Sequence, residues 1–315
     1  MEGLFKNSMT HLSVVIPLCD ESSLVYDLVS RVKTNVKLIT EDFEIIIVDD
    51  GSKDNTWNLI EIEAKSEKRI KGLKFSRNFG QHYAITAGLD YSTGEWVVVM
   101  DGDLQDRPEV IPTLYEKAIA GFDVVFVSRQ NRPEKIYYRI AQRIFYFILK
   151  KLSGIEFDSK QANFSIINRK VVEAFKEFSE YSRFYGSTIL WLGFNRSFVV
   201  ADHGKRLSGR PTYTFKNRLK LATDIILSFS ERPLKFTIYL GLFISLISLF
   251  GSFWIFIRTL KWGYSVVGWA SLIVSIFFLS GIILTVLGLI GIYIGRIFQQ
   301  VKNRPLFVIT SQVNL

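Results

Sequence analysis

Residues Trp96–Asp106 read WVVVMDGDLQD, an apolar run followed by three carboxylates within six positions. Such a run, rich in β-branched side chains, is typical of a strand buried on both faces of a sheet. In an extended segment side chains two residues apart point the same way, so Asp101 and Asp103 could bind one divalent cation, and Gly102 would let a ligand approach the backbone. The alternative is a structural turn or a helix cap before Pro108.

Similar apolar runs recur along the first half of the chain and alternate with helix-like stretches. The other expected strands are Leu12–Leu18, Phe43–Val48, Ile70–Phe75 and Asp123–Val127. The expected helices are Ser22–Ile39, Asn55–Glu67, Gln81–Tyr91 and Pro108–Ala120. This alternation predicts a parallel α/β sheet that binds its ligands at the carboxyl ends of the strands.

The turn after the first expected strand excludes two common classes of nucleotide-binding site. Residues 17–21 read PLCDE, without the glycines that a dinucleotide-binding fold or a P-loop requires, so both of those classes are excluded. The second expected strand is followed by Asp49 and Asp50. A diphosphate ligand at such an acidic edge would need a metal ion, Mg²⁺ or Mn²⁺.

Charge and cysteine content limit the possible disulfides and binding partners of the protein. The 315 residues carry a formal net charge of +9 and include one cysteine, Cys19, which excludes an intramolecular disulfide and which we expect to be a buried small apolar residue. The charge would suit nucleic acid or an anionic membrane, and its distribution favours the membrane, so we expect no nucleic acid partner. Leu12–Leu18 is too short for a signal peptide and lacks a cleavage site.

Two long uncharged runs near the C-terminus predict membrane spans. Phe236–Ile257 has 22 residues without a charge and Trp262–Gly295 has 34, whereas about 20 apolar residues cross a bilayer. We place the second crossing at Trp269–Ile292. Two buried helices of a soluble protein are the alternative, and they would require polar positions facing water.

Basic residues predict the orientation of these spans. Two, Arg258 and Lys261, lie between the spans. Eight lie outside them: Lys216, Arg218, Lys220, Arg232, Lys235, Arg296, Lys302 and Arg304. Because positive residues favour the cytoplasmic side, we expect a multi-pass protein of the bacterial plasma membrane with both termini in the cytoplasm. The expected domains are a catalytic head at 1–212, a juxtamembrane helix at 213–232, two spans within 233–295 and a tail at 296–315.

Two further segments have the pattern of helices that lie on a lipid surface. Residues 132–151 and 213–230 each repeat apolar and basic side chains at helical spacing. Ordinary amphipathic helices packed on the head are the alternative.

Four motifs occur together in a fixed order along the head. They are Val15-Ile16-Pro17 with Asp20-Glu21, Val48–Thr56 (VDDGSKDNT), Ser76–Gln81 (SRNFGQ) and Met100–Asp106 (MDGDLQD). In these motifs the chain resembles glycosyltransferase family two, which has the GT-A fold, and within it the polyprenyl-phosphate glycosyltransferases. That group includes dolichol-phosphate mannosyltransferases and bactoprenol glucosyltransferases, and the resemblance covers nearly the whole chain.

The resemblance implies a nucleotide-sugar site. Base and ribose would be held by Pro17, Glu21 and Asp50, with Asp49 close by. The diphosphate and its metal ion would be bound by Asp101, Asp103 and Gln105. Arg77 lies in the Ser76–Gln81 loop expected beside the nucleotide. The alternatives are helix caps for Glu21 and Asp50 and a surface cation for Arg77.

The resemblance also implies that an acceptor phosphate attacks the anomeric carbon with inversion. Asp158 is the candidate base or orienting group, with an ordinary loop aspartate as the alternative. Arg206 is expected to clamp phosphate, because guanidinium stays charged and matches phosphate oxygens. A cation attracted to anionic lipid is the alternative for Arg206. Further candidates for the acceptor phosphate are Arg129, Arg139 and Arg143.

The chain departs from the family pattern where the acceptor would bind. Ala162–Ser165 stands where Gly-Asp-Phe-Arg is frequent, and Pro211 and Thr212 replace a serine and a lysine. We expect transfer of glucose from UDP-glucose to undecaprenyl phosphate, with GDP-mannose as the alternative donor. A processive polysaccharide synthase, a non-enzymatic scaffold and a homo-oligomer are further hypotheses.

Overall fold

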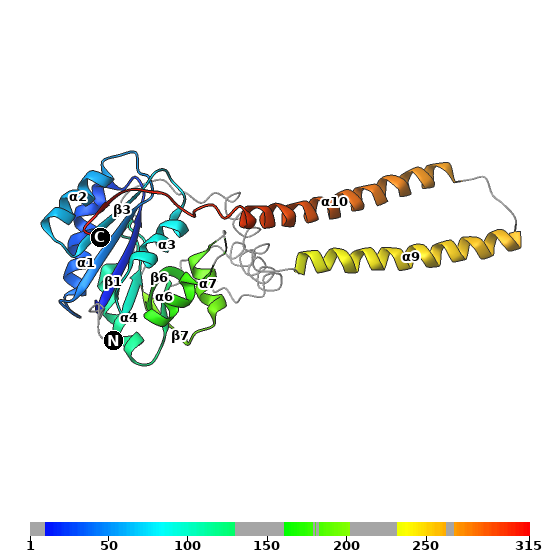
Figure 1. Cartoon of the computed structure of the whole chain (residues 1–315). Coiled ribbons are helices and arrows are strands. Elements are labelled where there is room, and N and C mark those ends of the chain that lie inside the picture. Colours follow the sequence, from blue (N-terminus) through cyan, green and yellow to red (C-terminus); the bar gives the residue numbers. More distant parts are fainter. Residues whose placement is uncertain (1–9, 130–160, 179, 181–182, 202–231, 263–267) are drawn as a thin grey trace, which may run out of the picture. The chain divides into compact units, whose positions relative to one another are not determined.

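The computed structural model describes residues 10–129, 161–178, 180, 183–201, 232–262 and 268–315 (Figure 1). These residues belong to two compact units. The head contains the described residues up to 201 together with 304–315, and the helical unit contains those from 232 to 303.

One mixed sheet organises the described part of the head. Its eight strands lie in the order β7-β5-β6-β4-β1-β2-β3-β8. They are β1 (Leu12–Leu18), β2 (Phe43–Asp49), β3 (Ile70–Phe75), β4 (Trp96–Val99), β5 (Val124–Arg129), β6 (Gln161–Asn168), β7 (Arg196–Ala201) and β8 (Ile309–Val313). β1 pairs in parallel with both β2 and β4 and is buried along its whole length, as its apolar sequence predicts. β6 and β8 pair antiparallel with their neighbours, so the sheet is mostly rather than wholly parallel.

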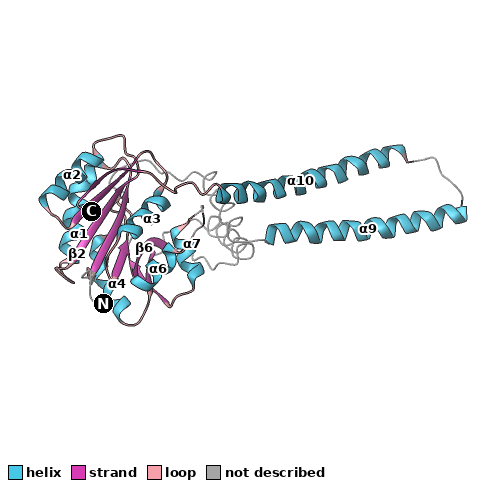
Figure 2. Ribbon diagram, in the orientation of Figure 1, coloured by secondary structure: helices cyan, strands magenta, loops and turns pink. Residues whose placement is uncertain are grey.

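Helices cover both faces of this sheet (Figure 2). The described helices of the head are η1 (Ser22–Leu24), α1 (Val25–Val36), α2 (Thr56–Ser66), α3 (Gln81–Tyr91), η2 (Pro108–Val110), α4 (Ile111–Ile119), α6 (Arg169–Lys176) and α7 (Tyr185–Leu192). Val14 and Ile16 of β1 belong to the apolar core that includes α1, α2 and α4. Val15 points to the opposite face, where a Cβ at Gly88 of α3 would lie 2.2 Å from Val15 Cγ1. A glycine there lets α3 approach the sheet closely.

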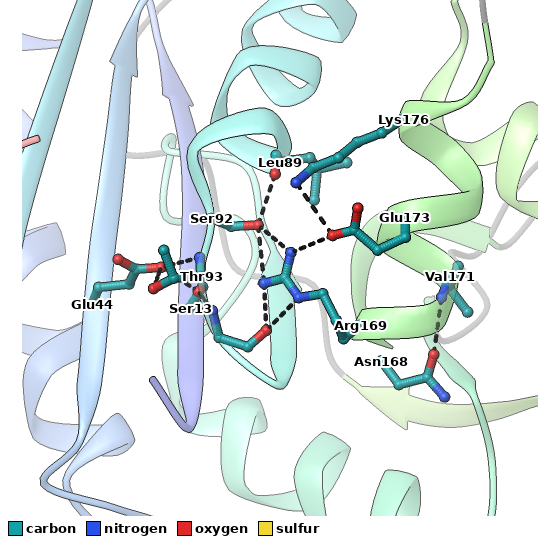
Figure 3. Close-up of polar contacts among 11 residues, drawn as sticks. Ser13, Glu44, Leu89, Ser92, Thr93, Asn168, Arg169, Val171, Glu173 and Lys176 are labelled. Carbon is teal, nitrogen blue, oxygen red and sulfur yellow. Dashed lines mark hydrogen bonds and ion pairs between the residues drawn. The ribbon is translucent and has the colours of Figure 1, made fainter. Parts of the chain in front are cut away.

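A network of polar side chains closes the amino ends of the central strands (Figure 3). Glu44, the second residue of β2, accepts hydrogen bonds from Ser13 Oγ at 2.6 Å and from Thr93 N at 2.6 Å. At the start of α6, Arg169 Nε donates to Gly94 O at 2.9 Å, while its Nη1 lies 3.2 Å from Glu173 Oε1. These contacts tie β1, β2, α6 and the turn before β4 together, so this end of the sheet is occupied by structural interactions.

The helical unit contains two long helices, α9 (Arg232–Trp262) and α10 (Trp269–Val301). α9 has 31 residues and α10 has 33. Among the described residues, one segment, Ser275–Val301 of α10, is long and apolar enough by itself to cross a membrane. Large apolar side chains of α9 are also exposed, among them Phe243 and Trp254. The expected interfacial segments 132–151 and 213–230 lie outside the described residues.

Candidate functional site

The carboxyl ends of β1 and β2 meet through backbone and side-chain contacts. Asp50 N donates to Leu18 O at 2.8 Å. Asp20 has φ of 54°, and its Oδ1 accepts from Lys53 N at 2.7 Å while its own N–H donates to Ser52 Oγ at 2.9 Å. The turn after β1 is therefore held against the turn after β2.

Asp50 connects this pair of turns to the loop that follows β3. Its Oδ1 accepts from Phe79 N at 2.7 Å and its Oδ2 accepts from Gly80 N at 2.9 Å. Burial raises the pKa of Asp50 to about 6 against the pull of these two amides, and neighbouring Asp49 adds to the rise. The Asp50 carboxylate thus orders residues 79–80, and it does not cap a helix that follows it in the chain.

Asp49 lies fully buried beside it and is incompletely satisfied. Its Oδ1 accepts from Ser52 N at 2.9 Å, whereas Oδ2 has no hydrogen-bond partner in the described structure. A buried carboxylate oxygen without a partner is costly in a native fold. The described residues supply no donor for this oxygen.

Gly51 allows the β2 and β3 loops to come together. It has φ of 69°, and a Cβ on it would lie 2.3 Å from the carbonyl carbon of Arg77. Any larger residue would therefore displace the loop that Asp50 binds.

The end of β4 carries the second acidic pair. Asp101 Oδ1 accepts from Gln81 Nε2 at 2.5 Å, and Asp101 N donates to buried Asp106 Oδ2 at 3.2 Å. Asp103 Oδ1 accepts from Gln105 N at 3.1 Å. These bonds fix the DGDLQD segment between β4 and the first residue of α3.

The same segment is held close to β1. A Cβ on Gly102 would lie 2.0 Å from Leu18 Cδ2 and 3.1 Å from Pro17 O, so a larger residue would have to displace the Leu18 side chain. The next residue but one, Leu104, has φ of 57°, a conformation that costs about 1–2 kcal/mol for a residue with a Cβ. The fold therefore holds Asp103 and Gln105 on either side of a strained residue.

Taken in order, these contacts join the ends of β1, β2, β3 and β4 into one connected edge of the sheet. β1 lies between β2 and β4, and the chain order reverses there, which is where open α/β sheets bind ligands. The structure brings together the predicted residues Pro17, Asp49, Asp50, Asp101, Asp103 and Gln105, directly or through shared contacts.

Three other predicted residues lie around this edge. Glu21 occupies the N-cap position of η1, but its side chain makes no capping hydrogen bond there. Arg77 is exposed, with its guanidinium carbon 4.4 Å from the centre of the Phe79 ring. Cys19 is only partly buried, which corrects the expectation of a core residue, and its sulfur accepts from Asn78 Nδ2 at 3.1 Å. Burial raises the pKa of its thiol, so it is not an activated nucleophile.

The predicted acceptor residues are mostly outside the described part. Asp158, Arg139, Arg143 and Arg206 all lie outside the described residues. Arg129 is the last residue of β5, where its backbone stands opposite Ala201 of β7. The described structure therefore shows the acidic edge of the site without Asp158, Arg139, Arg143 and Arg206.

Gln81, Asp54 and Asp106 lie within the quoted motifs, but no role of their own is predicted for them from the sequence. Gln81, which bonds Asp101, is the first residue of α3. Asp54 accepts from Ser22 N at 3.1 Å and Thr56 N at 3.0 Å, and thus joins η1 to α2. Buried Asp106 supports Asp101. The DxxxxD spacing of Asp101 and Asp106 was a usable signal, but nothing in the sequence indicates a partner for Gln81.

Comparisons with known proteins agree with this architecture. The profile of Glycosyl transferase family 2 matches residues 13–175, which include all the strand ends described above. The chain belongs to this family. It is a glycosyltransferase with a GT-A-like, mostly parallel sheet flanked by helices.

Several relatives of this glycosyltransferase match along nearly its whole length. It is 36% identical over 299 residues to the prophage-derived bactoprenol glucosyl transferase of Shigella flexneri, with 95% of this chain and 97% of the relative covered. It is 35% identical to the bactoprenol glucosyl transferase of Shigella phage SfX, with coverage of 96% and 99%. An uncharacterised glycosyltransferase of Synechocystis sp. is 37% identical over 95% of each chain.

A solved structure shows the same fold at greater distance. Glucosyl-3-phosphoglycerate synthase of Mycobacterium tuberculosis, in complex with Mn²⁺, UDP and phosphoglyceric acid, has a TM-score of 0.50 and 18% identity. The match covers 70% of this chain and 77% of the other. At this identity the likeness concerns the fold alone.

Proposed function

We propose that this glycosyltransferase moves glucose from UDP-glucose to a polyisoprenyl phosphate, undecaprenyl phosphate being the best candidate. The observation that carries the proposal is the extent of the relationship. The relatives of 35–36% identity that are named bactoprenol glucosyl transferases align with 95–96% of the chain, and thus include the helical unit as well as the head. The names of these relatives specify glucose and bactoprenol but no nucleotide, so UDP as the donor nucleotide is our own proposal.

The acidic edge of the sheet fits a donor site with a divalent cation. Asp101, Asp103 and Gln105 offer oxygen ligands, and Mg²⁺ bound with a nucleotide takes only one or two carboxylates from the protein, the rest being water and phosphate. Within the described ranges no three His, Cys, Asp or Glu side chains form a closed metal cage, so such a cation would depend on the nucleotide for further ligands. When bound, Mg²⁺ or Mn²⁺ neutralises charge on the departing nucleoside diphosphate.

The residues of β1, β2 and the β3 loop would hold the nucleoside. Asp49 and Asp50 offer buried acceptors, the first with an unpartnered oxygen. Pro17 and Glu21 would form the opposite wall and exposed Arg77 would cover the nucleotide from its loop. Buried acceptors that remain incompletely satisfied discriminate strongly in favour of a ligand that brings donors.

The acceptor phosphate would attack the anomeric carbon directly. One phosphate oxygen forms the new bond to that carbon while the bond to the diphosphate oxygen breaks, which inverts the configuration. A phosphate monoester has a second pKa of about 6, so it is largely dianionic at neutral pH and needs little help from a base. Asp158 would orient it, and Arg206, with Arg129, Arg139 and Arg143 as further candidates, would offset its repulsion from the donor.

The helical unit would anchor the head through two crossings. β8 follows α10 in the chain and pairs with β3 of the head, so the chain after α10 lies on the same side of any membrane as the head. A single crossing by α10 cannot satisfy that condition, because the number of crossings must then be even. α9, which at 31 residues is about 46 Å long, supplies the second crossing. An alkaline phosphatase fused after Leu315 should be inactive and one fused after Tyr264 active; activity after Leu315 would contradict two crossings.

A donor screen tests the reaction. The purified full-length protein in detergent, given Mg²⁺ and undecaprenyl phosphate, is expected to form undecaprenyl-phosphate glucose from UDP-glucose faster than it turns over GDP-mannose or other nucleotide sugars. A preference for GDP-mannose would change the proposed donor but leave the class, a polyisoprenyl-phosphate glycosyltransferase, unchanged. Failure of every donor to yield a lipid-linked sugar would overturn the proposed function.

A further inference from the structure

The C-terminal strand extends the sheet from the far end of the sequence. β8 pairs antiparallel with β3, with Gly72 opposite Val313 and Phe75 opposite Ile309. Asn314 Nδ2 fastens its end by donating to Ala64 O at 2.6 Å and Ile70 O at 2.9 Å. Without β8, β3 would be the edge of the described sheet.

The residues that precede β8 continue past the end of β3 and reach the donor-site loop. Ser76, the first residue beyond β3, donates its N–H to Val308 O at 2.9 Å. The Phe307 ring stacks on Phe75 with centroids 5.0 Å apart and planes 12° apart. These contacts are additional to the strand pairing, and they lie where the loop begins.

The aromatic contacts continue from Phe75 into the site itself. The Phe75 ring meets Phe79 edge to face at 5.6 Å, and the backbone N–H of Phe79 is the one bound by Asp50 Oδ1 at 2.7 Å. Gly80 then gives its N–H to the other oxygen of Asp50 and begins α3, whose first side chain, Gln81, bonds Asp101. Phe307 is thus linked to both acidic pairs through packed rings and three hydrogen bonds, two to Asp50 and one to Asp101.

We propose that Phe307 and Val308 position the donor site: they hold residues 76–81 in the conformation in which Asp50 and Asp101 are bound. This inference rests on the proposed function of that edge as the nucleotide-sugar site. Only residues 302–308, which include Phe307 and Val308, separate Val301 at the end of α10 from Ile309 at the start of β8. The order of the donor loop consequently depends on a segment that continues from the helical unit, and Phe307 is a positioning residue rather than a catalytic one.

Phe307→Ala tests this in the full-length protein. Loss of one aromatic stack is expected to raise the KM for the sugar donor by about three- to tenfold, with kcat and the KM for undecaprenyl phosphate within twofold of the parent. Phe307→Tyr keeps the stack and should restore the donor KM. Gln312→Ala removes an exposed side chain from the same tail and should leave all constants unchanged. A merely structural role would instead lower the fraction of active protein and leave KM as it was.

A second measurement does not depend on activity. Hydrogen exchange at the backbone amides of residues 76–81 is expected to accelerate in Phe307→Ala and to stay at the parent rate in Phe307→Tyr and Gln312→Ala. Unchanged exchange together with an unchanged donor KM would overturn the positioning role. If the parent itself uses no nucleotide sugar, the proposed function fails, while the exchange comparison still decides whether the tail orders this loop.

Discussion

Strand β2 begins and ends with buried carboxylates, and the two ends treat them differently. Glu44 near the start is 2% exposed, and Asp49 and Asp50 at the end are 0% and 3% exposed. Similar burial therefore occurs at both ends, and the difference lies in the partners. At the amino end the fold supplies a cation and hydrogen-bond donors for the buried carboxylate. At the carboxyl end one buried carboxylate oxygen has no partner in the described structure.

Glu44 is neutralised by its neighbours. Lys71 Nζ lies 2.5 Å from one carboxylate oxygen. Ser13 and Thr93 donate to the other oxygen (Figure 3). Burial alone would raise the pKa of Glu44, but Lys71 and these donors outweigh it and hold the pKa below its usual value. This is the pattern of a structural acid whose charged form the native fold favours.

Asp49 and Asp50 have no cation among the contacts described for them. They receive backbone amides from Ser52, Phe79 and Gly80, and one oxygen of Asp49 has no partner in the described structure. The pKa of Asp50 is raised, in contrast with that of Glu44. In this protein the incompletely compensated acidity lies at the edge that we propose binds the donor, and the compensated acidity lies at the other end of β2.

The largest effect is expected at the β4 end of the same edge. Asp103→Ala should lower kcat/KM at least about 100-fold and weaken Mg²⁺-dependent nucleotide binding, because a hard cation loses an oxygen ligand. Thermal unfolding should change little, since the described hydrogen bond of this carboxylate is a local one to Gln105 N. Glu116→Ala, which removes an exposed acid from α4, is the control. Near-parent activity of Asp103→Ala would rule out this residue as a metal ligand.

The next prediction compares substitutions at the two ends of β2, one expected to lower stability and the other expected to lower donor affinity. Glu44→Gln should destabilise the protein by about 1–3 kcal/mol, because Lys71 loses its partner and a satisfied network is broken. The donor KM of the folded protein should not move. Asp49→Asn should change the stability by less than about 1 kcal/mol but reduce the affinity for the donor. The reason is that it removes a buried charge that the fold leaves incompletely bonded. Chemical unfolding and calorimetry with UDP-glucose measure both. Equal losses of stability in the two variants would remove the distinction between the ends.

The sequence predicted much of the sheet because its central strands are buried on both faces. Leu12–Leu18 and Ile70–Phe75 are strands and Gln81–Tyr91 is a helix with the expected bounds. β6, β7 and β8 were missed. β6 reads QANFSIIN and β8 reads ITSQV, and such short segments with several polar residues lack the continuous apolar signal of a central strand. The residues 309–313 were expected to be part of a plain tail, and their strand character arises from pairing with β3.

The candidate site was predictable in position and not in detail. Parallel strands end at one edge, so carboxylates that follow β2 and β4 had to lie near each other. The partners of Asp50 are backbone amides of Phe79 and Gly80, which carry no signature in the sequence because every residue but proline has one. The stacking of Phe307 on Phe75 depends on the antiparallel register of β8, which local patterns do not specify. The roles of Asp158 and Arg206 stay predictions.

The smallest effect concerns the titration of Asp50, whose pKa of about 6 in the folded state compares with an ordinary value of 3.8. Below about pH 3 the group is mostly protonated in both states and contributes almost nothing to pH dependence. Between about pH 4 and 6 this carboxyl is ionised in the unfolded chain but still mostly protonated in the folded protein. The group therefore makes the folded protein less stable as pH rises, by about 1–2 kcal/mol after allowance for solvent screening.

Asp50→Asn removes that contribution. Acids whose pKa is lowered, such as Glu44, act in the opposite direction and remain in both proteins, so the informative quantity is the difference between parent and variant. The variant is expected to gain stability relative to the parent as pH rises from 4 to 6 and to show a constant difference above about pH 7. Asn keeps one oxygen for Phe79 N or Gly80 N, so a constant loss across all pH values reports the broken hydrogen bond and not the titration. Parallel stability curves through this window would show that Asp50 ionises as an ordinary carboxylate, and the contrast between the two ends of β2 would then rest on Asp49 alone.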